Sequence, residues 1–155
     1  MHAAFCPLCR TITSASSTAP ASVIAAMRET LVVLGDNQGC PGWSVLILRD
    51  HVEHLAELSD AGQASVFTEV ARVAAAIRAV FPASGVGGGP PRINYECLGN
   101  AEPHVHWHVI PRHADDPDPT KPVWGWPADQ LRGSMSDQER AALIARLRDA
   151  IRSAR

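Results

Sequence analysis

The residues best suited to chemistry in this 155-residue chain are three alternating histidines, His104, His106 and His108. Successive side chains of a β-strand point to opposite faces, so the three imidazoles would share one face and the intervening valine and tryptophan would pack on a core. With a rise of about 3.3 Å per residue, neighbouring imidazoles would lie roughly 6–7 Å apart. Such a row can bind a metal, hold a phosphate or supply a nucleophile. A surface cluster or a non-catalytic metal site is the alternative.

A second group of possible metal ligands is the Cys6-Pro-Leu-Cys9 sequence near the N-terminus. Two thiolates at this spacing can chelate one zinc ion from a tight turn. A redox pair would need a helix N-terminus after a strand, and the Ser-, Thr- and Ala-rich residues 11–22 are a poor setting for it. His51 and His54 share a face in a helical turn, and either could be a third ligand. Two ordinary thiols are the alternative.

Charge and composition exclude several classes of partner. The chain has 14 Lys+Arg and 16 Asp+Glu, a formal net charge of -2 that attracts neither nucleic acid nor membrane. It has no basic run interleaved with aromatics and no apolar stretch near the roughly 20 residues of a membrane span, so we expect neither a nucleic acid polymer nor a membrane as partner. The N-terminus lacks the pattern of a secretory signal, and the four cysteines do not resemble a disulfide framework. We therefore expect a cytoplasmic protein.

Hydrophobic patterning predicts one α+β domain over residues 1–155, a length that can bury a sizeable core. Two antiparallel hairpins are expected, the first joined by turn residues at 35–42. An amphipathic helix with a capping box at Asp60 and Gln63 lies between the hairpins, and a second helix follows a capping box at Ser136. The expected strands are 30–34, 43–48, 92–98 and 104–110, with Pro111 ending the last strand, and 23–27 forms a strand or a helix.

Three further segments complete the expected organisation. Residues 1–22 would form a zinc-knuckle arm, residues 113–135 a proline-rich loop and residues 136–155 a C-terminal helix. A loop of this length is often functional, and this one begins directly after the histidine strand. Its Trp124 and Trp126 either fold over the site or fill gaps, and the sequence leaves both interpretations open.

The His-Val-His-Trp-His-Val-Ile sequence of residues 104–110 resembles the His-φ-His-φ-His-φ-φ signature of the histidine triad (HIT) superfamily. The resemblance covers roughly residues 6–112. It includes the CxxC pair, a Pro-Gly before a strand, an Arg-x-His after that strand, the long helix and a Gly-Asn before the triad. The chain is most similar to bacterial members described as diadenosine tetraphosphate hydrolase-like. The resemblance implies a HIT-like α+β fold, a mostly antiparallel sheet of about five strands with one long helix packed on it, and a homodimer whose sheets join.

The resemblance also implies roles for four site residues. His106, at the middle position, would attack the α-phosphate of a nucleotide and form a nucleotidyl-histidine. An unperturbed imidazole has a pKa of about 6.5, so much of it is neutral and nucleophilic near pH 7. His108 would hold the phosphoryl oxygens and help the leaving group to depart. Asn100 matches a phosphate-contacting position, and Asn94 lies one residue from a ribose-binding position.

The same resemblance implies a structural zinc site. In members that carry CxxC, the metal is held by both cysteines, the histidine after the second strand and the first triad histidine. The matching residues are Cys6, Cys9, His51 and His104, so His51 is preferred over His54. This Cys2His2 set has no open coordination position, as is usual for structural zinc.

Two departures from the family pattern concern the substrate side of the site. Trp43 stands where many members have a histidine close to the catalytic one, and Ala101 stands where Ser or Thr is frequent. Both changes would remove polar contacts near the phosphate and the leaving group. We expect Trp43 and Trp124 to line the substrate site with the two asparagines. A nucleotide hydrolase is the favoured interpretation, and a nucleotidyltransferase or phosphorylase, or a non-catalytic zinc-stapled nucleotide-binding protein, are the alternatives.

Overall fold

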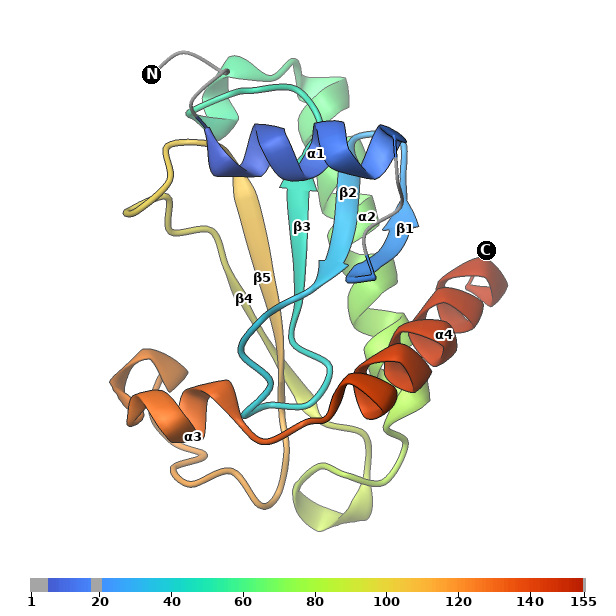
Figure 1. Ribbon diagram of the computed structural model, residues 1–155, viewed down its shortest axis with the longest axis vertical. Coiled ribbons are helices and arrows are strands. Elements are labelled where there is room, and N and C mark those ends of the chain that lie inside the picture. The colour runs from blue at the N-terminus through green and yellow to red at the C-terminus, as the bar shows by residue number, and fades with distance from the viewer. Residues whose placement is uncertain (1–5, 18–20, 155) are drawn as a thin grey trace.

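The computed structural model describes residues 6–17 and 21–154, and a five-stranded antiparallel sheet lies at its centre (Figure 1). The strand order is β1-β2-β3-β5-β4, so the last two strands form a hairpin added beside β3. The four expected strands are present, with β3 beginning one residue later and β4 ending two residues earlier than predicted, and the segment left open at 23–27 is a strand. The strands are β1 (Val23–Ala26), β2 (Thr30–Leu34), β3 (Ser44–Leu48), β4 (Arg92–Glu96) and β5 (His106–Arg112).

One face of the sheet is covered by helix α2 (Asp60–Val80), and helix α4 (Asp137–Ser153) packs against α2 and β1. Val32, Leu46 and Val109 point into this layer and form the main core with the apolar stripe of α2. The amphipathic helix of the sequence analysis is therefore confirmed. Its N-cap is Ser59, whose hydroxyl accepts from the amide of residue 62, so the expected capping box one residue later is wrong.

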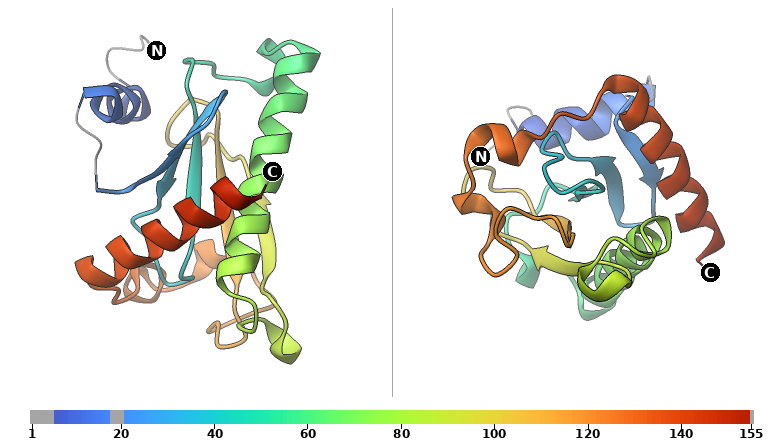
Figure 2. Two further views of the ribbon diagram at one scale, coloured as in Figure 1. Left: turned by 90° about the vertical axis from the view of Figure 1, so that its right-hand side faces the viewer. Right: turned by 90° about the horizontal axis from the view of Figure 1, so that it is seen from below.

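The opposite face carries helix α1 (Pro7–Ser17), as the side view in Figure 2 shows. Leu8 and Ile12 of α1 pack on Leu31, Val33 and Ile47 of the sheet. The sequence analysis expected only an arm here, because Ser and Thr are poor helix formers. The helix accommodates them because three hydroxyls bond to the carbonyl four residues earlier, those of Thr11, Thr13 and Ser16.

Strand β5 differs from the expectation at both ends. It begins at His106, so His104 lies just before the strand and not within it. Pro111 lies inside the strand, opposite Ile93 of β4, and does not end it. A proline is tolerated there because the pairing with β3 stops at Val109, so no ladder bond from the prolyl nitrogen is needed on that side.

The proline-rich segment after β5 is folded back onto the sheet. Arg112 anchors it through an ion pair with Asp116 at 2.6 Å and hydrogen bonds to two carbonyls of the segment. The segment contains helix α3 (Ala128–Arg132), and short 3₁₀ helices occur at Leu55–Glu57, Val86–Gly88 and Val123–Gly125. Within the described ranges, no helix is both long and apolar enough to cross a membrane.

Candidate active site and metal centre

His106 and His108 lie on the sheet face that α1 covers. The antiparallel register places them opposite Ile47 and Val45 of β3. Their ring centroids are 5.1 Å apart, closer than strand spacing alone predicted, because the rings meet edge-on at 76°. Both histidines line a pocket of about 350 Å³ between α1 and the sheet. The other lining residues are Leu8, Thr11, Ser22, Val33, Leu34, Gly35, Asp36, Asn37, Trp43, Val45 and Ile47.

His106 is oriented by the backbone of its own strand. Its Nδ1 lies 2.7 Å from the carbonyl oxygen of His104. A carbonyl can only accept, so Nδ1 must carry the hydrogen. In the neutral imidazole the lone pair is then on Nε2, which is the arrangement a nucleophilic histidine requires.

His108 is oriented by a different kind of partner. The indole Nε1 of Trp43 donates to its Nδ1 at 3.1 Å. Burial, with a smaller contribution from the nearby His106, lowers the pKa of His108 to about 4, so this imidazole is neutral at pH 7. Trp43 therefore supplies a polar contact to His108, which the sequence did not predict.

Trp124 brings the proline-rich segment to the site. Its ring lies edge-on to Trp43 and His108, with centroids 5.2 and 5.3 Å apart, and it remains 42% exposed. Its indole nitrogen donates to the carboxylate of Glu96 on β4. Trp126, in contrast, is packed with Ile110 in a small hydrophobic cluster. Of the two interpretations that the sequence left open, Trp124 therefore folds over the site and Trp126 fills a gap in the core.

The two predicted asparagines do not line the pocket. Asn94 lies opposite Ile110 on β4, and Asn100 is exposed in the turn before the triad. The pocket instead contains Asp36 and Asn37, at the end of β2. The sequence analysis took these two residues for turn residues, which they also are. Their position just after a strand of the sheet was the one sequence feature that could have indicated a role at the site.

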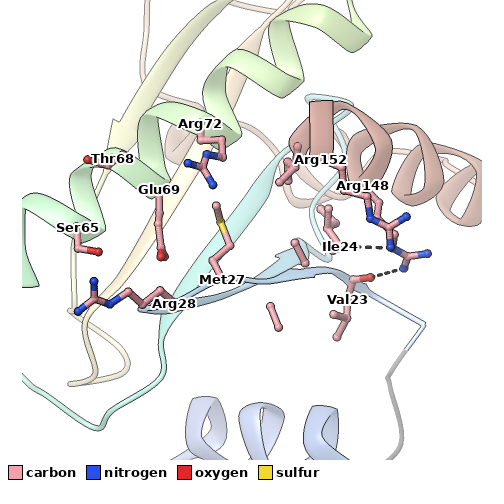
Figure 3. A pocket seen from close by; sticks show the side chains of 13 residues that line it. Val23, Ile24, Met27, Arg28, Ser65, Thr68, Glu69, Arg72, Arg148 and Arg152 are labelled. Atoms are coloured by element: carbon pink, nitrogen blue, oxygen red, sulfur yellow. Dashed lines mark hydrogen bonds between the residues drawn. The ribbon is translucent and has the colours of Figure 1, made fainter. Parts of the chain in front are cut away.

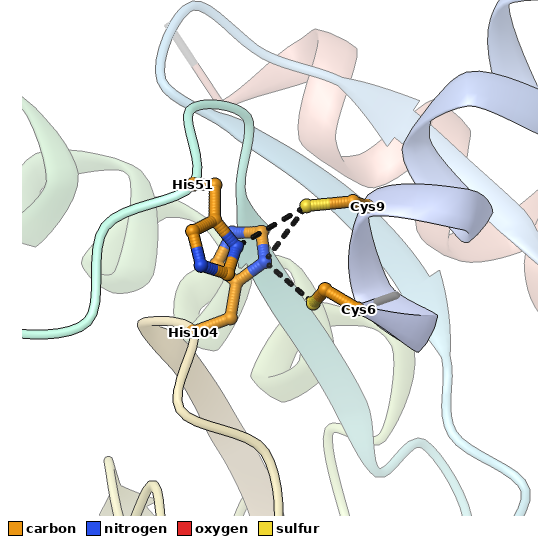
Figure 4. A group of neighbouring side chains, drawn as sticks. All are labelled: Cys6, Cys9, His51 and His104. Carbon is orange, nitrogen blue, oxygen red and sulfur yellow. Dashed lines mark hydrogen bonds between the residues drawn. The ribbon is translucent and has the colours of Figure 1, made fainter. Parts of the chain in front are cut away.

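The metal-ligand group predicted from the resemblance is assembled in the structure (Figure 4). The ligand atoms of Cys6, Cys9, His51 and His104 all lie within 4.8 Å of one another. The sulfur of Cys6 is 3.4 Å from Nδ1 of His104, and that of Cys9 is 3.3 Å from Nδ1 of His51. A tetrahedral zinc ion, with bonds of about 2.3 Å to sulfur and 2.0–2.1 Å to nitrogen, separates S and N ligands by about 3.5 Å. The donor set and its spacing fit zinc.

A backbone carbonyl orients one of these ligands, His104, as is usual for metal-binding histidines. Nε2 of His104 lies 2.7 Å from the carbonyl of Leu48, so Nε2 carries the hydrogen and Nδ1 faces the cysteines. Burial and the neighbouring Cys6 raise the pKa of the Cys9 thiol, which argues against a reactive redox cysteine. His54 is exposed at the start of a 3₁₀ helix, outside the group.

A larger cleft, of about 670 Å³, lies between β1, α2 and α4 and is separate from the triad (Figure 3). Several of its charged side chains already have partners. Arg148 donates to the carbonyls of Val23 and Ile24, and the buried carboxylate of Glu69 accepts from Thr30. The Arg148 contacts tie the edge strand β1 to α4, and the Glu69 contact ties β2 to α2, which is a structural role.

Comparison with known proteins agrees with this geometry. The family model for the HIT domain matches residues 16–115. The chain belongs to the histidine triad family. The HIT relative named Protein hit, from Bacillus subtilis (strain 168), is 29% identical over 133 residues, which cover 85% of this chain and 88% of the relative.

Solved HIT structures share the fold. A histidine triad protein from Sinorhizobium meliloti 1021 is 26% identical, with a TM-score of 0.69, and the match covers 82% of this chain and 87% of that chain. A histidine triad family protein from Mycobacterium smegmatis, described as Zn-bound, is 22% identical with a TM-score of 0.64 over 98% of this chain and 96% of that chain. The expected HIT-like α+β fold is confirmed.

Replacement of a metal ligand tests the metal centre of this HIT protein. We expect Cys6→Ser to lose bound zinc and to unfold at lower temperature, because a structural metal contributes folding free energy. Elemental analysis and thermal unfolding of the purified protein measure both effects. Cys97→Ser, at an exposed cysteine outside the group, is the matched control. Equal zinc content in wild type and Cys6→Ser would remove Cys6 from the ligand set.

Replacement of Trp124 tests whether the proline-rich segment shapes the HIT pocket. We expect Trp124→Ala to raise KM for a nucleotide substrate by roughly tenfold, the effect of losing about 1.4 kcal/mol of aromatic contact. Trp124→Phe keeps a ring against His108 but loses the bond to Glu96, so it separates the two contributions. Unchanged kinetics in both variants would leave Trp124 with a packing role only.

Proposed function

We propose that this protein is a nucleotide hydrolase that cleaves at the α-phosphate of adenosine polyphosphates or related adenylates. The observation that carries the proposal is the hydrogen bond from Nδ1 of His106 to the carbonyl of His104, which leaves the lone pair of Nε2 for attack. His108 and the polar end of β2 lie in the same pocket. The family membership supports the proposal.

The proposed reaction has two displacements at the α-phosphorus. The Nε2 lone pair of His106 forms a P–N bond, while the bond from phosphorus to the leaving group breaks and its electron pair leaves with that group. The resulting imidazolium charge is stabilised by the His104 carbonyl. Water then forms a P–O bond, the P–N electron pair returns to Nε2, and the proton of the water passes to solvent. Covalent catalysis replaces one difficult step with two easier ones.

The pocket offers separate regions for the parts of a nucleotide. Leu8 of α1 and Val33 and Ile47 of the sheet provide apolar walls for a base, and all three belong to one hydrophobic cluster. Asp36 and Asn37 provide a carboxylate and an amide that suit ribose hydroxyls. The phosphate would then reach the two histidines.

The same intermediate could be resolved by phosphate or a sugar phosphate, which would make the protein a transferase or phosphorylase. A third possibility is a nucleotide-binding protein without turnover. These functions predict different products from the same substrate, so the experiment below separates them.

We further propose that Cys6, Cys9, His51 and His104 hold a structural zinc ion. The ion would supply a cross-link between the N-terminal arm and the start of β5. The oriented Nδ1 atoms and the sulfur–nitrogen distances support this assignment. The described cysteines form no disulfide, and zinc thiolates persist in a reducing compartment, so we place the protein in the cytoplasm.

We also propose a single domain over residues 1–155 that forms a homodimer through the β4 edge. β4 has a partner strand on one side only. Tyr95 shares a sheet face with Val109, the face that α2 covers, and it is 51% exposed. Phe67 of α2, which packs on Trp107, is 48% exposed. Exposed aromatics beside an unpaired edge are typical of an interface.

The His106→Ala variant tests the proposed nucleophile. We expect turnover to fall by at least about 10³-fold, because the covalent route is lost, while the unfolding temperature changes little. Wild type and variant are incubated with diadenosine tetraphosphate, ADP, adenylyl sulfate and an adenosine phosphoramidate, and products are separated by chromatography. His54→Ala is the control for removing an imidazole elsewhere.

The products of this panel distinguish the functions. AMP or ADP released from one substrate by the wild type alone supports the hydrolase. Release only when phosphate or a sugar phosphate is added identifies a transferase. A His106→Ala variant with near-native activity would refute the proposed mechanism.

The homodimer is tested at the β4 edge. We expect Tyr95→Arg to shift the protein from dimer to monomer in light scattering after size exclusion, because a charge would be buried at the joined sheets. Val86→Arg, at an apolar residue that is 78% exposed away from the strand, is the control. A wild type that is monomeric at all protein concentrations would contradict the interface.

A further inference from the structure

The indole nitrogen of Trp43 forms a hydrogen bond with His108, in which it can act only as the donor. The Trp43 side chain is 2% exposed just before β3, and its Nε1 lies 3.1 Å from Nδ1 of His108. The rings meet at 79°, with centroids 5.7 Å apart. An indole N–H donates and cannot accept, so Nδ1 of His108 must present its lone pair to Trp43.

We propose that Trp43 is a positioning residue that holds His108 in the neutral tautomer with its hydrogen on Nε2. His108 then offers a fixed N–H donor beside Nε2 of His106. In the reaction proposed above, on which this part of the inference rests, that donor faces a phosphoryl oxygen. The opposite tautomer would present a lone pair to the negative oxygen and would repel it.

The need for such a partner follows from the chemistry of imidazole. A neutral histidine can carry its hydrogen on either nitrogen, and the partner of one nitrogen decides the state of the other. A histidine in place of Trp43 could donate or accept and would leave the choice open. Tryptophan has only the donor, so it admits one tautomer of His108 and also disfavours a doubly protonated ring.

The surroundings of His108 preserve this hydrogen bond. Trp124 packs edge-on against both rings of the pair. The titratable groups nearest His108 are His106 on the same strand and Glu96 opposite it on β4, and Asp36 lies in the same pocket. The carboxylate of Glu96 accepts from Trp124. Since burial holds the pKa of His108 near 4, its neutral form is the one that needs a defined tautomer at pH 7.

The chain provides a matched control for removing the indole nitrogen. Trp126 belongs to the same hydrophobic cluster as Trp43, and among the described residues its buried Nε1 has no hydrogen-bond partner. Trp43→Phe and Trp126→Phe therefore remove the same atoms from one cluster, but only the first removes a donor to His108.

Nitrogen-15 spectra of histidine-labelled protein test the tautomer directly, with the His108 signals assigned by their loss in His108→Gln. We expect the Nε2–H tautomer alone in wild type and Trp126→Phe between about pH 6 and 8, and a mixture in Trp43→Phe. A wild type with Nδ1–H or a charged ring at pH 7, or an unchanged tautomer in Trp43→Phe, would overturn the proposal. If Trp43→Phe does not fold, the wild-type spectrum still overturns the proposal when it shows Nδ1–H or a charged ring.

Kinetics on the preferred substrate test the donor role. Loss of one donor to a developing oxyanion costs about 10²–10³ in kcat, so a partial loss in Trp43→Phe should lower kcat at least about tenfold and leave KM within about twofold. A Trp43→Phe variant as active as Trp126→Phe would overturn the donor role. If the wild type turns over no substrate, the proposed function fails and the donor role with it, while the spectra still decide whether Trp43 holds His108.

Discussion

Two hydrogen bonds orient the histidines of the candidate active site, and each has a partner that can act only as donor or only as acceptor. The carbonyl of His104 can only accept, and it holds the hydrogen of His106 on Nδ1. The indole of Trp43 can only donate, and it holds the lone pair of His108 on Nδ1. In the proposed arrangement the two histidines of one strand take opposite tautomers, with a lone pair on Nε2 of His106 and a hydrogen on Nε2 of His108. The register of β3 and β5 sets His108 opposite Val45 and so places it near Trp43, which directly precedes β3.

His104 links this face to the candidate metal centre. Its carbonyl orients His106, while its ring, fixed by the carbonyl of Leu48, turns Nδ1 toward Cys6 and Cys9. A metal ion bound there would hold α1 against the sheet, and α1 also supplies Leu8 to the wall of the pocket. In this account, the four metal-binding residues stabilise helix α1 and, through α1, the shape of the proposed nucleotide pocket.

The sequence predicted the parts of this arrangement that depend on local periodicity or on a family motif. The strands and α2 followed from apolar patterns, because those signals are short-range. The clustering of Cys6, Cys9, His51 and His104 followed from the family motif. Helix α1 was missed because its Ser and Thr residues conceal a Leu8–Ile12 stripe that tertiary packing stabilises. Asp36 resembled an ordinary turn residue, and the donor role of Trp43 depends on a strand 65 residues away. No local pattern carries that information.

The central claim is that Nε2 of His106 attacks the α-phosphate. The most direct measurement is to mix the wild type with an α-³²P-labelled adenylate and quench within the first turnover in alkali, where a phosphorus–nitrogen bond to histidine survives. The labelled peptide is then mapped by mass spectrometry. The account predicts a nucleotidyl group on Nε2 of His106 that forms and decays at rates consistent with turnover. Turnover without this adduct, or an adduct on another residue, would contradict it.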